Sequence, residues 1–313
     1  MSMPIDLLIT QYCIPNVKVE AYGVYTNIPN NTPFRGFGNP QVFFAFEQLV
    51  DELAEKLNID PLELRIKNLA SEGDFNYFSK TKLTTYVLDK CLETAGKKAN
   101  WEKRNMLKQE KDSRRRGLGI GTFTYITSCA GSTEGWNESS SAVVYITTDG
   151  YVNVITGACE LGQGIYTTIC QMAAEVVGVS YEKVRVELNA DTFWQPWDWG
   201  SFASRANYVV GNAVIRAARD VKEKLLNFAS KKFKVTTESL DIKDGKIYDI
   251  RDGKVYCTIA EIAHYITETS TEPTQLMGFS NFVPRENPPP SGVQIAEVEV
   301  DIETGEIFIN ARL

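Results

Sequence analysis

The spacing of apolar residues changes near Gly117, and this change restricts the possible folds more than any other feature of the sequence. Before it, the apolar side chains of residues 40–57 fall on one face at helical spacing, which predicts an amphipathic helix. After it, residues 142–147 and 151–155 alternate around Asp149-Gly150, which predicts a tight antiparallel hairpin. We therefore expect an α+β fold with mixed, mostly antiparallel sheets and packed helices.

Other segments follow one of these two patterns. Asp60 can cap a helix that has Pro61 in its first turn. The remaining predicted helices cover residues 86–98, 165–177, 208–228 and 259–266. A strand is predicted at residues 184–188, and two further hairpins are predicted at residues 241–257 and 297–310.

The 313 residues are enough for two domains of ordinary size. Residues 1–3 are interpreted as a remnant of an expression tag. We expect a helical domain at residues 4–103, a solvated charged connector without apolar periodicity at residues 104–116, and a larger domain at residues 117–313. Because the sequence stops within or just after a predicted strand, we interpret it as truncated, or as one half of a split subunit.

The charge of the chain narrows the classes of partner. The net charge is −7 and the basic residues are scattered, which argues against binding to nucleic acid or to an anionic membrane. No apolar run approaches the roughly 20 residues that a membrane helix needs. We therefore expect a soluble, cytoplasmic protein.

The cysteines and the single histidine give little support to metal or nucleophilic chemistry. The six cysteines contain no C-x-x-C pair, which argues against structural zinc and iron–sulfur ligation in this chain. His264 lies in a predicted helix and is expected to be structural. A thiol enzyme that uses Cys129 or Cys159 is an alternative, but neither residue has a histidine near it in sequence.

Residues 32–41 combine an arginine, two aromatic residues and two glycines directly before a predicted helix. Gly36 and Gly38 permit positive φ angles and a close approach of the backbone to a bound group. Asn39 is expected to be the N-cap and Pro40 the first helical residue. The turn could hold a planar or anionic group, or it could be a buried aromatic turn that only opens the helix.

Two further stretches combine small residues with a helix start. Residues 156–168 pass from a strand through glycines into a helix, so their backbone N–H groups could form an anion cradle, or simply a tight turn. Their spacing fits neither a dinucleotide-binding fingerprint nor a P-loop. Residues 191–207 offer short polar side chains beside alanines that leave room for a bulky group, or that form the polar start of a closely packed helix.

Together these stretches resemble the large molybdopterin-binding subunit of the molybdenum hydroxylases, the family of xanthine dehydrogenases and aldehyde oxidases. The resemblance runs from about Tyr12 onward and rests on phrases in the family's order. These phrases are YTNI at residues 25–28, FRGFGNPQ at 34–41, GACELGQG at 157–164, ASRA at 203–206, VGNA at 210–213, AEVEVD at 296–301 and TG at 304–305.

The resemblance implies roles for residues of the first two stretches. Phe37 matches the aromatic residue that packs against the substrate ring, and Arg35 with Gly36 matches the segment that borders the molybdenum oxo ligands. Gly162, Gln163 and Gly164 match the stretch that hydrogen-bonds the pterin.

The third stretch carries the other implied site residues. Phe202 and Ala203 match the small-residue pair that lines the substrate pocket, although Phe202 is bulkier than the alanine of some members and would narrow the pocket. Ala203, Ser201 and Ser204 are implied to contact the cofactor. Tyr125 and Trp136 lie where the family has another pocket aromatic.

Two family features lie outside this sequence: an upstream glycine-rich segment, and a Gly-Glu-Pro segment whose glutamate is the general base. The resemblance therefore implies no catalytic base and no direct metal ligand among residues 1–313. It implies a molybdenum–molybdopterin cofactor, expected in the cytosine dinucleotide form, with iron–sulfur clusters and FAD on partner chains or domains. The implied partners are the rest of the molybdopterin subunit, an iron–sulfur subunit and an FAD subunit, in an oligomer.

The implied reaction is the oxidation of a purine or other N-heterocycle, or of an aldehyde, with water as the source of oxygen. The isolated chain is expected to be inactive because the base lies elsewhere. The alternative from another class is a cofactor-free truncated domain or a non-catalytic assembly subunit, which the missing glutamate and the abrupt end favour.

Overall fold

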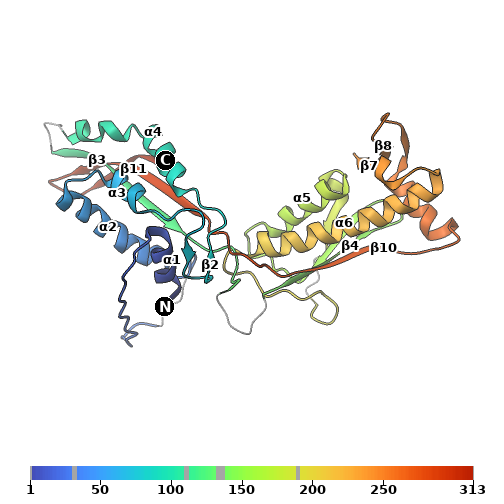
Figure 1. Ribbon diagram of the computed structural model, residues 1–313, viewed down its shortest axis with the longest axis horizontal. Helices are drawn as coiled ribbons and strands as arrows, with labels where there is room; N and C mark the ends of the chain where they lie inside the picture. The colour runs from blue at the N-terminus through green and yellow to red at the C-terminus, as the bar shows by residue number, and fades with distance from the viewer. Residues whose placement is uncertain (1, 30–33, 109–112, 132–137, 188–190, 313) are drawn as a thin grey trace. The chain divides into compact units, whose positions relative to one another are not determined.

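The computed structural model describes residues 2–29, 34–108, 113–131, 138–187 and 191–312. The chain forms two compact units, the first made of Met1–Glu134 with Glu286–Leu313 and the second of Gly135–Arg285 (Figure 1). Both units combine helices with sheets that are mostly antiparallel, which confirms the predicted α+β class.

The first unit is built on a three-stranded antiparallel sheet in the order β12-β11-β3. Ile120 of β3 pairs with Ile295 of β11, and both are buried with Leu92 and Trp101 in a small apolar core. The elements of this unit are α1 (Ser2–Tyr12), α2 (Asn39–Leu57), α3 (Pro61–Asn68), β1 (Phe75–Asn76), β2 (Thr81–Lys82), α4 (Leu88–Lys98), η1 (Trp101–Lys108), β3 (Arg114–Thr124), β11 (Ser291–Asp301) and β12 (Ile307–Arg312).

The second unit is built on a four-stranded sheet in the order β10-β4-β5-β6, in which only β5 and β6 are parallel. Helix α6 lies along β4 and β10, with α5 beside it (Figure 1). The main strands and helices are β4 (Ser140–Ile146), β5 (Val152–Thr156), α5 (Ile165–Val177), β6 (Val184–Val186), α6 (Ala206–Phe233) and β10 (Leu276–Phe282).

A smaller antiparallel sheet, β7-β8-β9, extends the second unit. Ile247 of this sheet is buried in the same apolar core as Ile169 of α5 and Leu225 of α6, so the two sheets share one core. The elements here are η2 (Tyr181–Lys183), η3 (Thr237–Ser239), β7 (Leu240–Lys243), β8 (Lys246–Asp249), β9 (Val255–Thr258), α7 (Ile259–His264) and η4 (Tyr265–Thr269).

Helix α6 and strand β10 approach each other so closely that only glycine fits between them. A Cβ atom at Gly278 would lie 2.1 Å from the carbonyl oxygen of Ala217. Alanines at positions 213, 217 and 218 of α6 are fully buried. This contact fixes α6 on the sheet, and with it the loop that precedes α6.

The strongest periodic segments fold as predicted. The helix expected at residues 40–57 is Asn39–Leu57, and the helix expected at 165–177 is found with the same bounds. Asp60 caps α3, since its Oδ1 accepts hydrogen bonds from the backbone N–H groups of Leu62 and Glu63. The predicted hairpins at 142–155 and 297–310 are β4-β5 and β11-β12.

The chain divides at other points than the sequence suggested. Residues 104–116 do not separate the two units, because Arg114–Thr124 form β3 and pair with β11. Arg114 and Arg116 place their guanidinium nitrogens 2.9 and 3.1 Å from Glu299 across this pair, so these charges belong to a strand and not to a solvated connector. The chain instead passes from the first unit to the second after residue 134 and returns to the first unit after residue 285.

The N-terminal residues belong to a helix. Ser2 and Met3 belong to α1, and Met3 is buried. Among the described residues, no helix combines the length and the apolar character needed to cross a membrane.

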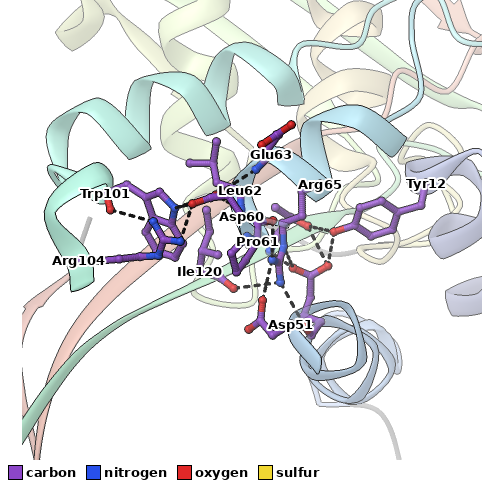
Figure 2. Close-up of polar contacts among 12 residues, drawn as sticks. Tyr12, Asp51, Asp60, Pro61, Leu62, Glu63, Arg65, Trp101, Arg104 and Ile120 are labelled. Atoms are coloured by element: carbon purple, nitrogen blue, oxygen red, sulfur yellow. Dashed lines mark hydrogen bonds and ion pairs between the residues drawn. The ribbon is translucent and has the colours of Figure 1, made fainter. Parts of the chain in front are cut away.

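A buried arginine joins three helices and a strand of the first unit (Figure 2). Arg65 is fully buried, and all five N–H groups of its guanidinium donate hydrogen bonds. The five acceptors of Arg65 are Glu47 Oε2 (2.9 Å), Asp51 Oδ1 (2.7 Å) and the carbonyl oxygens of Pro61 (3.1 Å), Glu47 (3.1 Å) and Ile120 (3.3 Å). Tyr12 of α1 donates a hydrogen bond to Oε1, the other carboxylate oxygen of Glu47.

Candidate functional site

The turn before α2 adopts an unusual backbone conformation. Gly36, Phe37 and Gly38 have φ angles of 91°, 49° and 88°, so three successive residues occupy the left-handed region. The backbone N–H of Asn39 donates to the carbonyl of Gly36 at 2.9 Å and closes the turn. A Cβ at Gly36 would lie 2.8 Å from Pro40, so the turn itself requires this glycine. Phe37 has no such freedom, and its conformation is strained.

The helix starts one residue earlier than predicted. Gly38 is the N-cap and Asn39 the first helical residue, so Asn39 does not cap the helix. Its side chain is buried instead, and its amide nitrogen donates to the carbonyl of Thr124 at 2.6 Å. The amide oxygen of Asn39 is buried without a hydrogen-bond partner in the described part of the chain. Asn39 thus ties the turn to the end of β3.

The side chains of this turn face solvent in the first unit. Phe34 is fully exposed, Phe37 is 58% exposed, and Arg35 is exposed. In the described part of this segment, the two aromatic side chains are therefore not buried. An arginine and two aromatic rings next to a strained backbone form a surface that can receive a flat or anionic group.

The other two stretches meet in the second unit. A Cβ at Gly157 would lie 2.4 Å from the carbonyl oxygen of Pro196, so the backbones of the two loops are in direct contact. The hydroxyl of Ser201 donates to the carbonyl of Cys159 at 2.9 Å, and Gln163 Nε2 donates to the same oxygen at 2.8 Å. We call residues 157–164 the glycine loop and residues 196–204 the serine loop.

The glycine loop does form an anion cradle, but a carboxylate of the chain itself fills it. Glu160 Oε1 accepts from the N–H groups of Gly162 (2.8 Å) and Gly164 (2.9 Å), and its Oε2 accepts from Tyr166 at 3.2 Å. These hydrogen bonds lower the pKa of Glu160, and the one from the backbone N–H of Gly164 has the largest effect. The carboxylate is exposed, and no atom lies within 4 Å of the positions that a Cβ would take at Gly162 or Gly164.

Gln163 is held inside this loop. Its Oε1 accepts from the N–H of Leu161 while its Nε2 donates to Cys159, so both ends of the side-chain amide are used locally. Gln163 is therefore placed to shape the loop, and the expected contact with the pterin stays a prediction.

The serine loop places the other predicted residues on strained backbone. Ala203 and Ser204 have φ angles of 53° and 51°, and Gly200 has a φ of 115°. Left-handed conformations of non-glycine residues cost on the order of 1–3 kcal/mol each and persist only where neighbours enforce them. Phe202 is 48% exposed, and its ring lies 5.7 Å from that of Trp199.

Arg205 could not be assigned to the site from the sequence alone. It is fully buried and directly follows the strained pair, at the start of α6. A lone arginine among small residues is the signal that could have revealed it. Its hydrogen bonds go to Glu138 Oε1 (2.5 Å), both oxygens of Asp198 (3.2 Å), Ser140 Oγ (2.6 Å) and the carbonyl oxygens of Gly200 (2.8 Å) and Ser139 (3.1 Å).

The remaining candidates lie in other segments of the chain or outside the described residues. Tyr125 directly follows β3 in the first unit; burial raises its pKa, and its N–H donates to the carbonyl of Pro290 at 2.8 Å. Trp136 lies outside the described residues. His264 is exposed, with Nδ1 3.5 Å from Glu268. Within the described ranges, no group of three or more His, Cys, Asp or Glu side chains is placed to hold a metal ion.

Two family models match the chain. Both are described as molybdopterin cofactor-binding domains, one over residues 2–69 and the other over residues 94–311. The chain therefore belongs to the molybdopterin cofactor-binding domains of the molybdenum hydroxylase family.

Relatives with curated names agree with this assignment. The chain is 35% identical over 297 residues to the xanthine dehydrogenase molybdenum-binding subunit of Escherichia coli O157:H7, an alignment that covers 92% of this chain and 38% of the relative. It is 31% identical over 215 residues to the xanthine dehydrogenase/oxidase of Gallus gallus, covering 68% of this chain and 16% of the relative. The chain thus spans well under half of the curated relatives that it matches.

Solved structures share the fold. Quinoline 2-oxidoreductase from Pseudomonas putida 86 aligns with a TM-score of 0.77 and 24% identity over 89% of this chain and 37% of that chain. The aldehyde oxidoreductase from Desulfovibrio gigas aligns with a TM-score of 0.65 and 26% identity over 90% of this chain and 29% of that chain.

Proposed function

We propose that this chain is part of a molybdenum-dependent hydroxylase or dehydrogenase of the xanthine dehydrogenase type, in which it supplies one side of the cofactor and substrate pocket. The family models and the identity to a bacterial molybdenum-binding subunit support this proposal. A purine is the first expected substrate class, followed by other N-heterocycles and then aldehydes, with water as the oxygen source.

The observation that most supports this proposal is the contact between the glycine loop and the serine loop. Two backbone N–H groups of the glycine loop and one of the first turn of α5 converge on one carboxylate, which is the donor set that an anionic group on a cofactor needs. The space beside Gly162 and Gly164 is open, and the carboxylate that now fills the cradle is exposed and can turn away. The residues present therefore fit an anionic pterin cofactor.

Each candidate residue has a proposed task. Gly162, Gln163 and Gly164, with Ser201, Ala203 and Ser204, hold the pterin, and Arg35 with Gly36 borders the metal. Phe37 orients a flat substrate, since offset or edge contacts between rings contribute about 0.5–1.5 kcal/mol. Phe202 and Ala203 line the substrate pocket, and Phe202 narrows it. When bound, the molybdenum–pterin group supplies the oxidation–reduction chemistry.

The proposal assigns the rest of the machinery to other chains or domains. These carry the general base, the iron–sulfur clusters and FAD, in a cytoplasmic oligomer that includes the rest of the molybdopterin subunit. The cofactor is proposed in its cytosine dinucleotide form, and no residue of this chain binds the metal directly.

The test is to measure molybdenum and pterin in this polypeptide, recovered from its native host with whatever chains accompany it. About one molybdenum and one pterin per copy would support the proposal, and turnover of purines, nicotinate-like rings and aldehydes would then rank the substrates. Metal-free and pterin-free protein that is recovered alone would refute it.

One observation favours a second candidate, a cofactor-free domain or a non-catalytic assembly subunit. Glu160 satisfies the donors of the glycine loop, so this loop is complete without a cofactor. The same measurement decides between the two, since an assembly subunit would be recovered with partner chains but without molybdenum.

A further inference from the structure

We propose that Arg205 is a positioning residue that clamps the serine loop in the shape that receives the pterin. This inference rests on the proposed function of the loop. Arg205, Glu138 and Asp198 were assigned no role from the sequence. Their side chains are at most 2% exposed, and Arg205 forms ion pairs with both carboxylates.

All three nitrogens of the Arg205 guanidinium donate hydrogen bonds. It has five N–H groups, and acceptors of the second unit lie within 3.2 Å of its three nitrogens. Two of its acceptors, Asp198 and the carbonyl of Gly200, belong to the serine loop itself. The others, from residues 138–140, lie at the start of β4. The arginine therefore fastens the loop to the sheet.

Both ends of the serine loop are anchored through this cluster. At the first end, the N–H of Ser141 donates to the carbonyl of Trp197 at 2.9 Å, and the hydroxyl of Ser140 donates to Asp198 Oδ2 at 2.5 Å. At the second end, the carbonyl of Arg205 accepts the first helical hydrogen bond of α6, from the N–H of Val209 at 2.7 Å. The distance that the loop must span is thereby fixed.

The residues between these anchors have conformations that they would not keep alone. Gly200, Ala203 and Ser204 have positive φ angles, and only Gly200 tolerates this without strain. The Oδ1 atom of Asp198 accepts from the N–H of Gly200 at 2.7 Å while it receives Arg205, so the charged pair also shapes the first turn of the loop. We infer that the clamp enforces the strained geometry at the residues proposed to contact the cofactor.

Lysine cannot replace this arginine, since three donors on one flexible ammonium cannot serve acceptors on several sides of a planar group. The test compares Arg205→Lys with Arg65→Lys in the full complex. Arg65 is the matched control because it is the same residue type, is equally buried and is equally saturated with hydrogen bonds, but it lies in the first unit and outside the proposed cofactor contacts.

Two quantities are measured: hydrogen exchange of the amides of residues 199–204, and molybdenum and pterin per folded molecule. We expect Arg205→Lys to raise exchange in the loop roughly tenfold and to lose most of the cofactor. Arg65→Lys should lower the melting temperature and leave both loop exchange and cofactor content at the wild-type level. If Arg205→Lys does not fold, Ser140→Ala, which removes a single hydroxyl of the cluster, should give the same pattern in milder form.

The outcomes separate the clamp from the proposed function. Unchanged exchange in Arg205→Lys, or faster exchange with full cofactor content, overturns the inference. So does an equal loss of cofactor in both lysine variants, because general destabilisation would then explain it. Wild-type protein without molybdenum or pterin overturns the proposed function together with the role of the clamp toward the cofactor, whereas the exchange data then still show whether Arg205 holds the loop.

Discussion

Replacing Gly157 by alanine tests the contact between the glycine loop and the serine loop directly. The added Cβ would lie 2.4 Å from the carbonyl oxygen of Pro196 and 3.1 Å from the backbone nitrogen of Asp198. Non-bonded carbon contacts are optimal near 3.5 Å, so one loop must retreat by about 1 Å. Since the nearest atom is backbone, no side-chain rotation can relieve the overlap.

The cost of Gly157→Ala can be estimated from two contributions. Overpacking typically destabilises a protein by about 1–3 kcal/mol. Separating the loops also breaks the hydrogen bond from Ser201 to Cys159, with a net contribution of about 1 kcal/mol. The sum, about 2–4 kcal/mol, corresponds to a fall of roughly 4–16 °C in the melting temperature of a unit of this size.

Thermal unfolding of the recovered complex measures this effect, and Gly162→Ala is its control. A Cβ at Gly162 meets nothing within 4 Å, but its φ of 93° is unfavourable for alanine. The control should therefore cost only backbone strain, about 1–2 kcal/mol, and leave the two loops in contact. A melting temperature of Gly157→Ala within about 1 °C of wild type would refute the close approach of the two backbones.

Three further predictions concern single side chains. Phe37→Ala should lower the rate or weaken substrate binding in steady-state kinetics at unchanged molybdenum content, and loss of the metal would instead make Phe37 a scaffold residue. Gln163→Ala should lower pterin content, and normal occupancy would remove this residue from the site. Because the backbone N–H of Gly164, with those of its neighbours, lowers the pKa of Glu160, the carboxylate stabilises the fold above its unfolded pKa, and this contribution is lost as the pH falls through the folded value. Thermal melts of Glu160→Gln between about pH 6 and 3 should therefore decline less steeply than those of the wild type, and parallel curves would contradict this assignment.

The sequence predicted best what depends on local pattern. Helix α5 and the hairpin β4-β5 are specified by periodicity and by an Asp-Gly turn, both of which act within a few residues. The conformation of the turn at Gly36 and Gly38 and the cradle at Gly164 could be predicted for a similar reason, since glycine and helix starts have known backbone preferences.

The contacts between distant segments could not be predicted in the same way. The charged run before β3 contains three adjacent arginines and no apolar period, so it was interpreted as a connector, although Arg114 and Arg116 face a glutamate 183–185 residues further along the chain. The acceptors of Arg65 likewise come from segments up to 55 residues away. A single sequence shows neither pairing.

Arg205 explains why the proposed site could be identified from residues that do not themselves maintain its conformation. The glycine and serine loops are recognisable because their small residues leave backbone exposed, but small residues supply few contacts that could maintain a strained conformation. Other residues must therefore make the loops rigid, and for the serine loop we propose that these are Arg205, Glu138 and Asp198. Resemblance to a family therefore indicates the surface that we propose to meet a ligand, whereas the charged cluster beside this surface becomes visible only in the structure.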